Sequence, residues 1–561
     1  MNLKNFALLL ALASSAGCSQ NYKAQSGLDE TASGGQLQNN ASSPDKDPVT
    51  GAFRAPVLPD VYRLGSSMAA MRYNPYNILD ENILVDGARD LHSLGFRTIK
   101  IWMNREVKNE NFYHFPEERL RPIVDSVQLL DLDQYKQVFD MDFKTWFLLE
   151  EVPAEANGSG NTWELKAQQP LSQEARDRIY HDFYQLTKGL LERYAGTGKI
   201  FILQNHEADW HITDDMSPSS MKSQTPAQQA NMRDYLSLRQ EALNRARRES
   251  SATQVYVYHM CEAVAVMRSW KNNRESVVRD ILPTTPCDLY GYSAYDSSLS
   301  SPDDFKQSLA YFYSHTQPSF AFGRDNIAIS EIGAPENSMP GREDLVRQSI
   351  DIAFANSPRV PYIVLWNGYD NECPMSTNLP SLQKSCAGFW VRRVDRTLSK
   401  LYKLIEPRLR DAATDEEFVQ KMFTKHLSRN PGLGEFSPAV AFIRAHSRAD
   451  FEESVQNSEE AKQEFVRRLY QRFLNRSPNS IDIASWGRNL NESNGYWSHV
   501  ANQFAAEPEV RTKFVEELYK KHLKREGSPG EIAGWVEVLA NGGSRASVES
   551  AFIKAARSGE S

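Results

Sequence analysis

Between residues 61 and 410, short runs of β-branched and aromatic residues alternate with longer stretches whose apolar residues recur at helical spacing. This alternation is typical of βα units, which build a parallel sheet. Two of the helices are predicted at 80–94, where Gly95 ends the pattern, and at 174–194. The predicted strands are 62–68, 98–103, 144–149, 199–205, 255–259, 289–293, 327–330 and 362–366.

Eight strands with intervening helices over about 350 residues predict an α/β fold, a (β/α)₈ TIM barrel with long loops. The alternative is a doubly wound open sheet. A nucleotide-binding version of that sheet has little support, because no Gly-rich phosphate loop follows an early strand.

Beyond Leu409 the pattern becomes helical and repeats with a period of about fifty residues. Three copies each carry Phe-Val, then an aromatic residue, then Leu-x-Arg, beginning at Phe418, Phe465 and Phe514. We interpret 415–556 as an all-α domain of three stacked helical repeats that share a core. Trp486 and Trp535 take equivalent places and are most simply core residues. The copies resemble a short helical repeat of uncharacterised function that recurs at the C-terminus of bacterial exported proteins.

The first eighteen residues have the pattern of an export signal. Lys4 precedes an apolar stretch, 6–13, which is too short to span a bilayer permanently. The small residues before Cys18 resemble a bacterial lipoprotein signal, in which that cysteine becomes the lipidated N-terminus. Ser15 stands where the motif usually has Leu, so ordinary signal cleavage is the alternative. We expect an exported protein held in the bacterial cell envelope by its lipid, and Ser19 resembles the sorting pattern for the outer membrane.

Residues 19–60 are rich in Gly, Ser, Asn, Gln and Asp, which predicts a flexible linker. Export permits disulfides. Cys373 and Cys386 bracket a polar loop and are predicted to form one, whereas the state of Cys261 and Cys287 stays open. The spacing of these four cysteines does not resemble a zinc site.

Charge limits the partners. The chain has 64 basic and 72 acidic residues, a formal net charge of −8, which argues against a nucleic-acid partner. Its 11 histidines show no cluster with ligand-like spacing. We therefore predict no cofactor and no metal, and expect a cell-wall polymer or a protein as the possible partner of the repeats.

Candidate chemistry lies where the predicted strands end, because barrel enzymes carry their reacting groups at the carboxyl ends of strands. The fourth strand runs into Asn205-His206-Glu207, and the seventh ends with Ser330-Glu331-Ile332-Gly333. The two strands face each other across an eight-stranded barrel, so the two carboxylates can converge. Glycosidic cleavage needs such a pair, one to protonate the leaving oxygen and one to attack the anomeric carbon.

These residues resemble the large clan of retaining (β/α)₈ glycoside hydrolases, known as clan A. Members place an acid/base Glu just behind an Asn after strand four, and a nucleophilic Glu at the end of strand seven. The resemblance implies that Glu207 is the acid/base and Glu331 the nucleophile. His206 is a departure, because many members have Asn and Glu adjacent. The resemblance covers roughly 62–400 and leaves the sugar, its anomeric preference and endo or exo action open.

Supporting roles follow in part from the same resemblance. Asn205 either bonds the sugar 2-hydroxyl or ties down its own loop. Tyr295 is expected to donate to Glu331, as the equivalent residue does in the clan. Trp366 offers a flat face for a pyranose ring or fills the core, and His206 is a structural hydrogen-bonder or a second acid. Further residues expected to line the cleft are Asn104, Trp210 and Tyr292. Reserve carboxylates at the ends of strands three and five are Glu150, Glu151 and Glu262.

The function predicted from the sequence is a retaining glycoside hydrolase that acts on a polysaccharide or oligosaccharide outside the cytoplasm. One alternative is a carbohydrate-binding or adhesive surface lipoprotein that keeps the barrel without turnover. A metal-dependent hydrolase on the same barrel is a further alternative. The sequence argues against that class, because no His-x-His ends the first strand.

Overall fold

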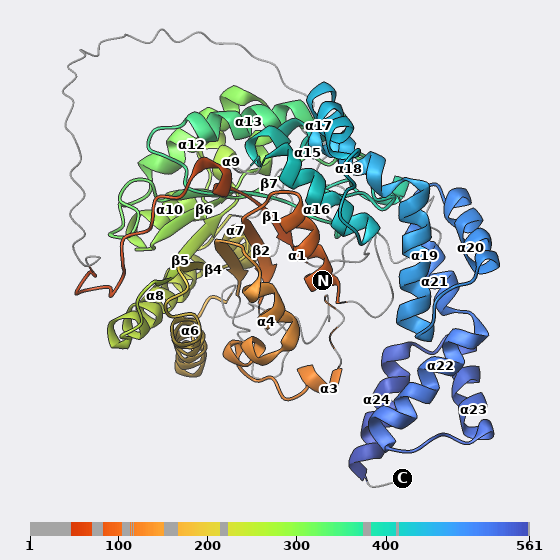
Figure 1. Ribbon diagram of the computed structural model, residues 1–561. Helices are drawn as coiled ribbons and strands as arrows, with labels where there is room; N and C mark the ends of the chain where they lie inside the picture. The colour runs from red at the N-terminus through yellow and green to blue at the C-terminus, as the bar shows by residue number, and fades with distance from the viewer. Residues whose placement is uncertain are drawn as a thin grey trace.

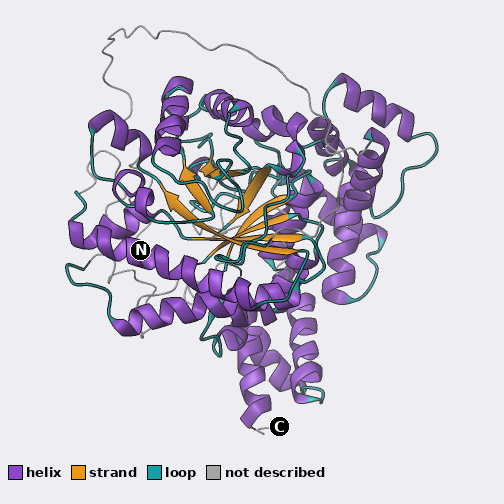
Figure 2. Cartoon of the chain, turned by 90° about the vertical axis from the view of Figure 1, so that its left-hand side faces the viewer, coloured by secondary structure: helices purple, strands orange, loops and turns teal. Residues whose placement is uncertain are grey.

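The computed structural model of the 561-residue chain describes residues 46–69, 82–103, 113, 115, 117–150, 167–213, 223–373, 383–410 and 414–558. Eight parallel strands close into a barrel in the order β1 to β8, with β1 paired to β8, and helices surround it (Figures 1 and 2). The strands are β1 Leu64–Met68, β2 Thr98–Trp102, β3 Thr145–Leu149, β4 Lys199–Gln204, β5 Val255–Ala263, β6 Leu289–Ser293, β7 Ile327–Ile332 and β8 Ile363–Leu365. The (β/α)₈ prediction is confirmed, and closure excludes the open sheet.

Helices cover the outside of the barrel because each buries one apolar stripe against the strands. The longest are α6 Gln173–Arg193 and α8 Pro226–Glu249, which pack against each other. The others around the barrel are α1 Ile83–Ser93, α3 Glu117–Leu120, α4 Asp133–Asp140, α7 Ala208–Thr213, α9 Val266–Asn272, α10 Val277–Asp280, α11 Tyr295–Ser298, α12 Pro302–Ser314, α13 Glu343–Ala355 and α15 Lys400–Ile405. None of the helices in the described part of the chain is long and apolar enough to cross a membrane.

The barrel interior changes character along its axis. Its lower part, which is the part nearer the amino ends of the strands, is filled by apolar side chains, among them Phe147, Ile202 and Tyr258. Successive residues of a strand face opposite sides, so the next inward positions on β4 and β5 beyond Met260 are Gln204 and Glu262, both fully buried. The upper end of the barrel is therefore polar, and this is the end that the carboxyl ends of the strands share.

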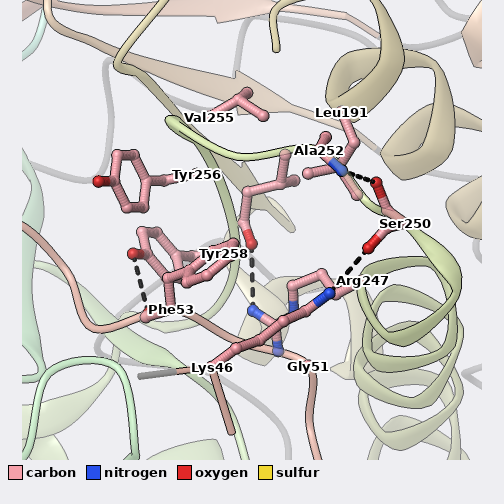
Figure 3. A pocket seen from close by; sticks show the side chains of 11 residues that line it. Lys46, Gly51, Phe53, Leu191, Arg247, Ser250, Ala252, Val255, Tyr256 and Tyr258 are labelled. Atoms are coloured by element: carbon pink, nitrogen blue, oxygen red, sulfur yellow. Dashed lines mark hydrogen bonds between the residues drawn. The ribbon is translucent and has the colours of Figure 1, made fainter. Parts of the chain in front are cut away.

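The linker predicted at 19–60 ends earlier than expected. From Lys46 onward the chain packs on the lower end of the barrel, where Ala52 and Leu58 are buried in the same cluster as the interior residues. Lys46 Nζ donates to the Ser250 carbonyl at 2.8 Å, and the Tyr258 hydroxyl donates to the Phe53 carbonyl at 3.2 Å (Figure 3). The polar composition of residues 19–60 predicted a linker throughout. The few small and apolar residues after Lys46 are nevertheless enough to cover the lower end of the barrel.

Two disulfides are present among the described residues. Cys373 and Cys386 are joined, as predicted, and Cys261 is joined to Cys287. Cys18, the signal at 1–18, the linker as far as residue 45, Asn104 and Glu151 lie outside the described residues.

The C-terminal region is helical and extends away from the barrel (Figure 1). It divides into three units, each of three helices. The first unit holds α16 Asp415–Leu427, α17 Phe436–Ala445 and α18 Arg448–Gln456; the second holds α19 Glu459–Leu474, α20 Ser480–Glu492 and α21 Trp497–Ala505; the third holds α22 Pro508–Leu518, α23 Pro529–Ala540 and α24 Arg545–Ser558. The second unit shares its core with the first.

Each unit contains the same arginine contact. The arginine lies over an aromatic ring and pairs with a carboxylate six residues later. The ring belongs to the first helix in the first two units, and in the third unit to the π-helical segment Tyr519–Leu523 that continues α22. These residues are Arg429 with Phe423 and Glu435, Arg476 with Tyr470 and Asp482, and Arg525 with Tyr519 and Glu531. The residue before each arginine has a positive φ, of 54°, 49° and 57°. The Leu-x-Arg pattern in the sequence thus marks the turn that ends the first helix of each unit.

Candidate active site

Three glutamates meet at the polar end of the barrel. Glu207 follows β4, Glu262 lies near the end of β5, and Glu331 lies near the end of β7; all three are at most 3% exposed. Parallel strands of a barrel bring their carboxyl ends to one rim, which is why residues more than a hundred positions apart converge.

Glu331 owes its direction to an irregularity in β7. Strict alternation would send its side chain outward, because Ser330 before it faces inward. The register of β7 shifts against β6 after Tyr292 and against β8 between Ile329 and Ile332, and such an irregularity re-aims side chains. Glu331 Oε1 therefore meets Lys100 Nζ inside the barrel at 2.5 Å.

Two donors hold the Glu331 carboxylate. Lys100, on β2 and fully buried, provides the ammonium, and the Tyr295 hydroxyl, at the start of α11, donates to Glu331 Oε2 at 3.3 Å. The geometry of Tyr295 is the one that the clan resemblance implies. Each oxygen of this carboxylate therefore accepts a hydrogen bond, one from an ammonium and one from a hydroxyl.

Glu207 sits in a tight turn. Its φ is 26°, in the left-handed region that residues with a side chain rarely adopt. The Ser293 hydroxyl donates to Glu207 Oε1 at 3.0 Å, and His206 Nε2 lies 3.6 Å from Glu207 Oε2. The Glu207 N–H donates to Glu262 Oε2 at 2.7 Å. The turn thus directs Glu207 toward β6 and β7.

The environment of Glu207 favours its neutral form. Burial, followed by the negative charges of Glu331 and Glu262, raises the pKa of Glu207 well above its ordinary value. Burial also raises the pKa of Glu262 to about 7, with the charge of Lys100 opposing and that of Glu331 adding to the shift. Burial and the two neighbouring charges thus favour the neutral form of Glu207, whereas Glu331 is in direct contact with the Lys100 ammonium.

The other predicted site residues differ in how they are placed. Asn205 is buried, and its Oδ1 accepts the Glu262 N–H at 2.9 Å, so it ties β4 to β5. Trp366, directly after β8, has its ring centroid 5.9 Å from Lys100 Nζ and so lies next to the carboxylates. Trp210, on α7, is buried against Val264 and Ala265. The His206 ring packs on Trp102 at 5.5 Å.

Tyr292 was predicted wrongly as a residue that lines the cleft. Its side chain is fully buried between β6 and α12, where it stacks on Phe305 and bonds Asp296 at 2.5 Å. Because residues of a strand alternate, Ser293 takes the inward position beside Glu207 and Tyr292 faces the helices.

Sequence reasoning missed Lys100 and ranked Glu262 only as a reserve. Both lie within apolar strands, and a charged residue in the middle of a buried strand is itself a signal, because it needs a partner there. Of the other reserve carboxylates, Glu150 pairs with Arg239 of α8 at 3.2 Å and so belongs to the helix side of the barrel.

Comparison with solved structures finds glycoside hydrolases. A substituted GH5_18 from Bifidobacterium longum subsp. longum ATCC 55813, in complex with Manb1-4GlcNAc, has 11% identity and a TM-score of 0.42, covering 62% of this chain and 78% of that one. A family 5 xyloglucanase from Paenibacillus pabuli has 9% identity and a TM-score of 0.39, covering 63% and 99%. The exo-beta-1,4-mannosidase Op5Man5 from Opitutaceae bacterium strain TAV5 has 13% and 0.39, covering 66% and 62%. At this level of sequence identity, the similarity concerns the fold and gives no information on substrate or mechanism.

A family model for a domain of unknown function, DUF4214, matches residues 498–559, which span α21 and the third unit. No curated protein sequence matches the chain.

Potential metal ligands gather in two places among the described residues. One group is His259 with Cys261 and Cys287, and the other is Asp370 with Cys373 and Cys386. In both groups the two cysteines are joined in a disulfide, so they offer no thiolate. Neither group includes Glu207 or Glu331.

A neutral carboxylic acid beside an ionised carboxylate in a buried site can perform one reaction class well. The acid protonates a leaving oxygen while the carboxylate attacks or stabilises the carbon that loses it. Cleavage of a glycosidic bond uses the acid because an alkoxide is a poor leaving group, and the carboxylate because the anomeric carbon develops positive charge.

Proposed function

We propose that this protein is a retaining glycoside hydrolase that acts on a polysaccharide or oligosaccharide outside the cytoplasm, with Glu207 as acid/base and Glu331 as nucleophile. The observation that carries the proposal is the unequal pair itself. Lys100 and Tyr295 hold Glu331, while burial and two negative charges raise the pKa of Glu207.

The proposed reaction has two steps. In the first, Glu331 attacks the anomeric carbon as the glycosidic C–O bond breaks, and Glu207 gives its proton to the departing oxygen. In the second, Glu207 takes a proton from water, whose oxygen displaces Glu331 from the anomeric carbon. Double displacement retains the anomeric configuration and requires the two carboxyl groups to lie about 5–5.5 Å apart.

Glu331→Gln tests the nucleophile. An amide cannot form the covalent intermediate, so hydrolysis of the glycan or aryl glycoside that the wild type accepts should fall by at least about 10³-fold. The variant should still unfold cooperatively, with a lower melting temperature because buried Lys100 loses the charge of Glu331. Glu150→Gln is the matched control, since Glu150 is a buried strand-end carboxylate that faces the helices, and it should keep its turnover. NMR of the first-formed product gives its anomeric configuration. Turnover by Glu331→Gln at the wild-type rate, or inversion of configuration, contradicts the proposal.

Glu207→Ala distinguishes the two roles within the same experiment. Its loss should slow cleavage of glycosides with poor leaving groups by about 10³-fold. A dinitrophenyl glycoside should suffer much less in its first step, because dinitrophenolate departs without a proton. A carbohydrate-binding protein without turnover would show binding of the glycan and no hydrolysis by any variant.

We also propose that Cys18 carries lipid and anchors the protein in the bacterial cell envelope, at the outer membrane. Support comes from the small residues that precede Cys18 behind a short apolar stretch. Incorporation of labelled palmitate in the wild type, lost in Cys18→Ser, is the expected result. Equal labelling of both forms would contradict it.

A further inference from the structure

Glu262 contacts the candidate acid, Glu207, through the backbone of that residue. Glu262 Oε2 accepts the Glu207 N–H at 2.7 Å, and Glu262 Oε1 accepts the Gln204 side-chain amide at 2.9 Å. From the same residue, the backbone N–H donates to Asn205 Oδ1 at 2.9 Å. Glu262 is therefore bonded to Gln204, Asn205 and Glu207, which together form the end of β4 and the turn that follows.

We propose that Glu262 is a positioning residue that fixes the turn carrying Glu207, and that its negative charge acts on Glu207 during the reaction. The inference rests on the proposed function, in which Glu207 is the acid/base. It assigns to Glu262 neither contact with substrate nor proton transfer.

The backbone of Glu207 explains why such a residue is needed. A φ of 26° strains a residue that has a side chain, and this conformation persists only where surrounding groups hold it. The turn contains one residue, His206, between Asn205 and Glu207. The strained φ lets the chain absorb that residue and still aim Glu207 at Ser293. A buried N–H paired with a carboxylate is a strong bond that can offset this cost.

The charge of Glu262 is the second part of the inference. Lys100 Nζ lies 2.5 Å from Glu331 Oε1 and 3.9 Å from Glu262 Oε1. When Glu331 becomes an ester in the covalent intermediate, its charge disappears while Glu262 remains beside the ammonium. A buried ammonium without a counter-charge is costly, so this arrangement keeps Lys100 compensated in both halves of the reaction.

The titration of Glu207 depends on several neighbours, and Glu262 is one that can be changed without touching the reacting groups. The titratable groups that face Glu207 come from five elements or turns: Glu331 on β7, Glu262 on β5, Lys100 on β2, Tyr295 on α11 and His206 in its own turn. A negative charge near a carboxylic acid raises its pKa, so removal of the Glu262 charge should lower the pKa of Glu207.

Two substitutions separate position from charge. Glu262→Gln keeps an oxygen that accepts the Glu207 N–H and removes the charge. Its kcat should stay within about tenfold of the wild type, while the alkaline limb of the kcat/KM–pH profile moves to lower pH. Glu262→Ala removes the acceptor as well, and misplacement of a reacting group on this scale costs about 10²-fold. We expect that loss in kcat, with KM nearly unchanged, because Glu262 does not touch the substrate.

Asp182→Asn is the matched control. Asp182, on α6, is a buried carboxylate that bonds Ser126 and is not among the groups that act on Glu207. It should leave both kcat and the alkaline limb unchanged. Melting temperatures of all variants show how much of any effect is general loss of stability.

Wild-type kcat in Glu262→Ala, or an unmoved alkaline limb in Glu262→Gln, would overturn the inference. Crystal structures of the wild type and Glu262→Ala provide a test that needs no turnover. We expect the Glu207 backbone to leave its positive φ and to break its contact with Ser293. An unchanged turn overturns the inference whatever the enzyme hydrolyses. Failure of the proposed function would be recognised by a different result: the Glu331→Gln variant would hydrolyse the substrate at the wild-type rate.

Discussion

At the scale of single residues, Glu207 and Glu331 differ in the charges around them. Glu331 contacts an ammonium and a phenol hydroxyl, whereas Glu207 lies near two carboxylates, a serine hydroxyl and the His206 ring. Lys100 Nζ lies 2.5 Å from Glu331 Oε1, and an ammonium and a carboxylate at that distance form a strong charge-assisted hydrogen bond. The proposed roles therefore rest on these contacts more than on the positions of the two residues at the ends of β4 and β7.

The two candidate carboxylates and the residues that bond to them could be predicted only in part. Glu207, Glu331 and Tyr295 could be named because each follows or ends a strand whose position in a barrel is known. Tyr292 was misplaced because its neighbour Ser293 takes the inward position, and a one-residue error in register sends a side chain to the other face. The sequence reveals Lys100 as a charged residue within a buried strand. It does not reveal the partner, Glu331, which lies on a strand more than two hundred residues away.

At the scale of elements, all eight strands could be predicted and the irregularity in β7 could not. Apolar runs bounded by turns give the strands, because burial on both faces makes them continuous. The register shift around Ile329 depends on how β6 and β8 pair with β7, which local sequence does not contain. That shift is what brings Glu331 into the barrel.

The segment before β1 allows a prediction about stability. Leu58 is 8% exposed in the cluster at the lower end of the barrel, whereas its neighbour Val57 is 87% exposed. Leu58→Ala should lower the free energy of unfolding by about 2 kcal/mol, since it leaves a cavity. Val57→Ala, the matched control, should change it by less than about 0.5 kcal/mol. Denaturant midpoints measure both, and equal midpoints would mean that the segment contributes no packing.

At the scale of the whole molecule, the helical region joins the barrel through the segment after β8. Phe389 of this segment packs on Tyr295, 5.5 Å between ring centroids, and so contacts the site. A few residues on, the Arg396 guanidinium lies 3.5 Å from the Trp497 ring centroid of the second unit. Tyr496 of that unit bonds Gln383. The repeats thus support the rim beside the candidate nucleophile.

The contact between the repeats and the barrel lies beyond sequence reasoning. A repeat pattern identifies the residues that units share, and these form the common core. It does not show which of the shared residues also contact the barrel. Lys425 and Glu452 of the first unit meet Asp90 of α1 and Arg392 in a buried cluster. Equivalent positions hold Lys521 and Glu549 in the third unit, where Lys521 is 65% exposed.

This equivalence supplies a matched pair of variants. Burial alone would raise the pKa of Glu452, but the charges of Lys425 and Arg392 outweigh it and hold that pKa well below its usual range. Glu452→Gln leaves these two cations with Asp90 alone and should lower the free energy of unfolding by about 3 kcal/mol at pH 7. Glu549→Gln, whose partner Lys521 is exposed, should cost less than about 1 kcal/mol.

The pH dependence gives this prediction its sign. A carboxylate with a depressed folded-state pKa stabilises the protein above its unfolded pKa of about 4.3, and this stability is lost as the pH falls through the folded value. The gap between wild type and Glu452→Gln should therefore be widest near neutral pH and shrink under acid, as denaturant midpoints at several pH values would show. A constant gap would mean that Glu452 acts by packing alone. Equal losses in Glu452→Gln and Glu549→Gln would mean that the cluster does not fasten the first unit to the barrel.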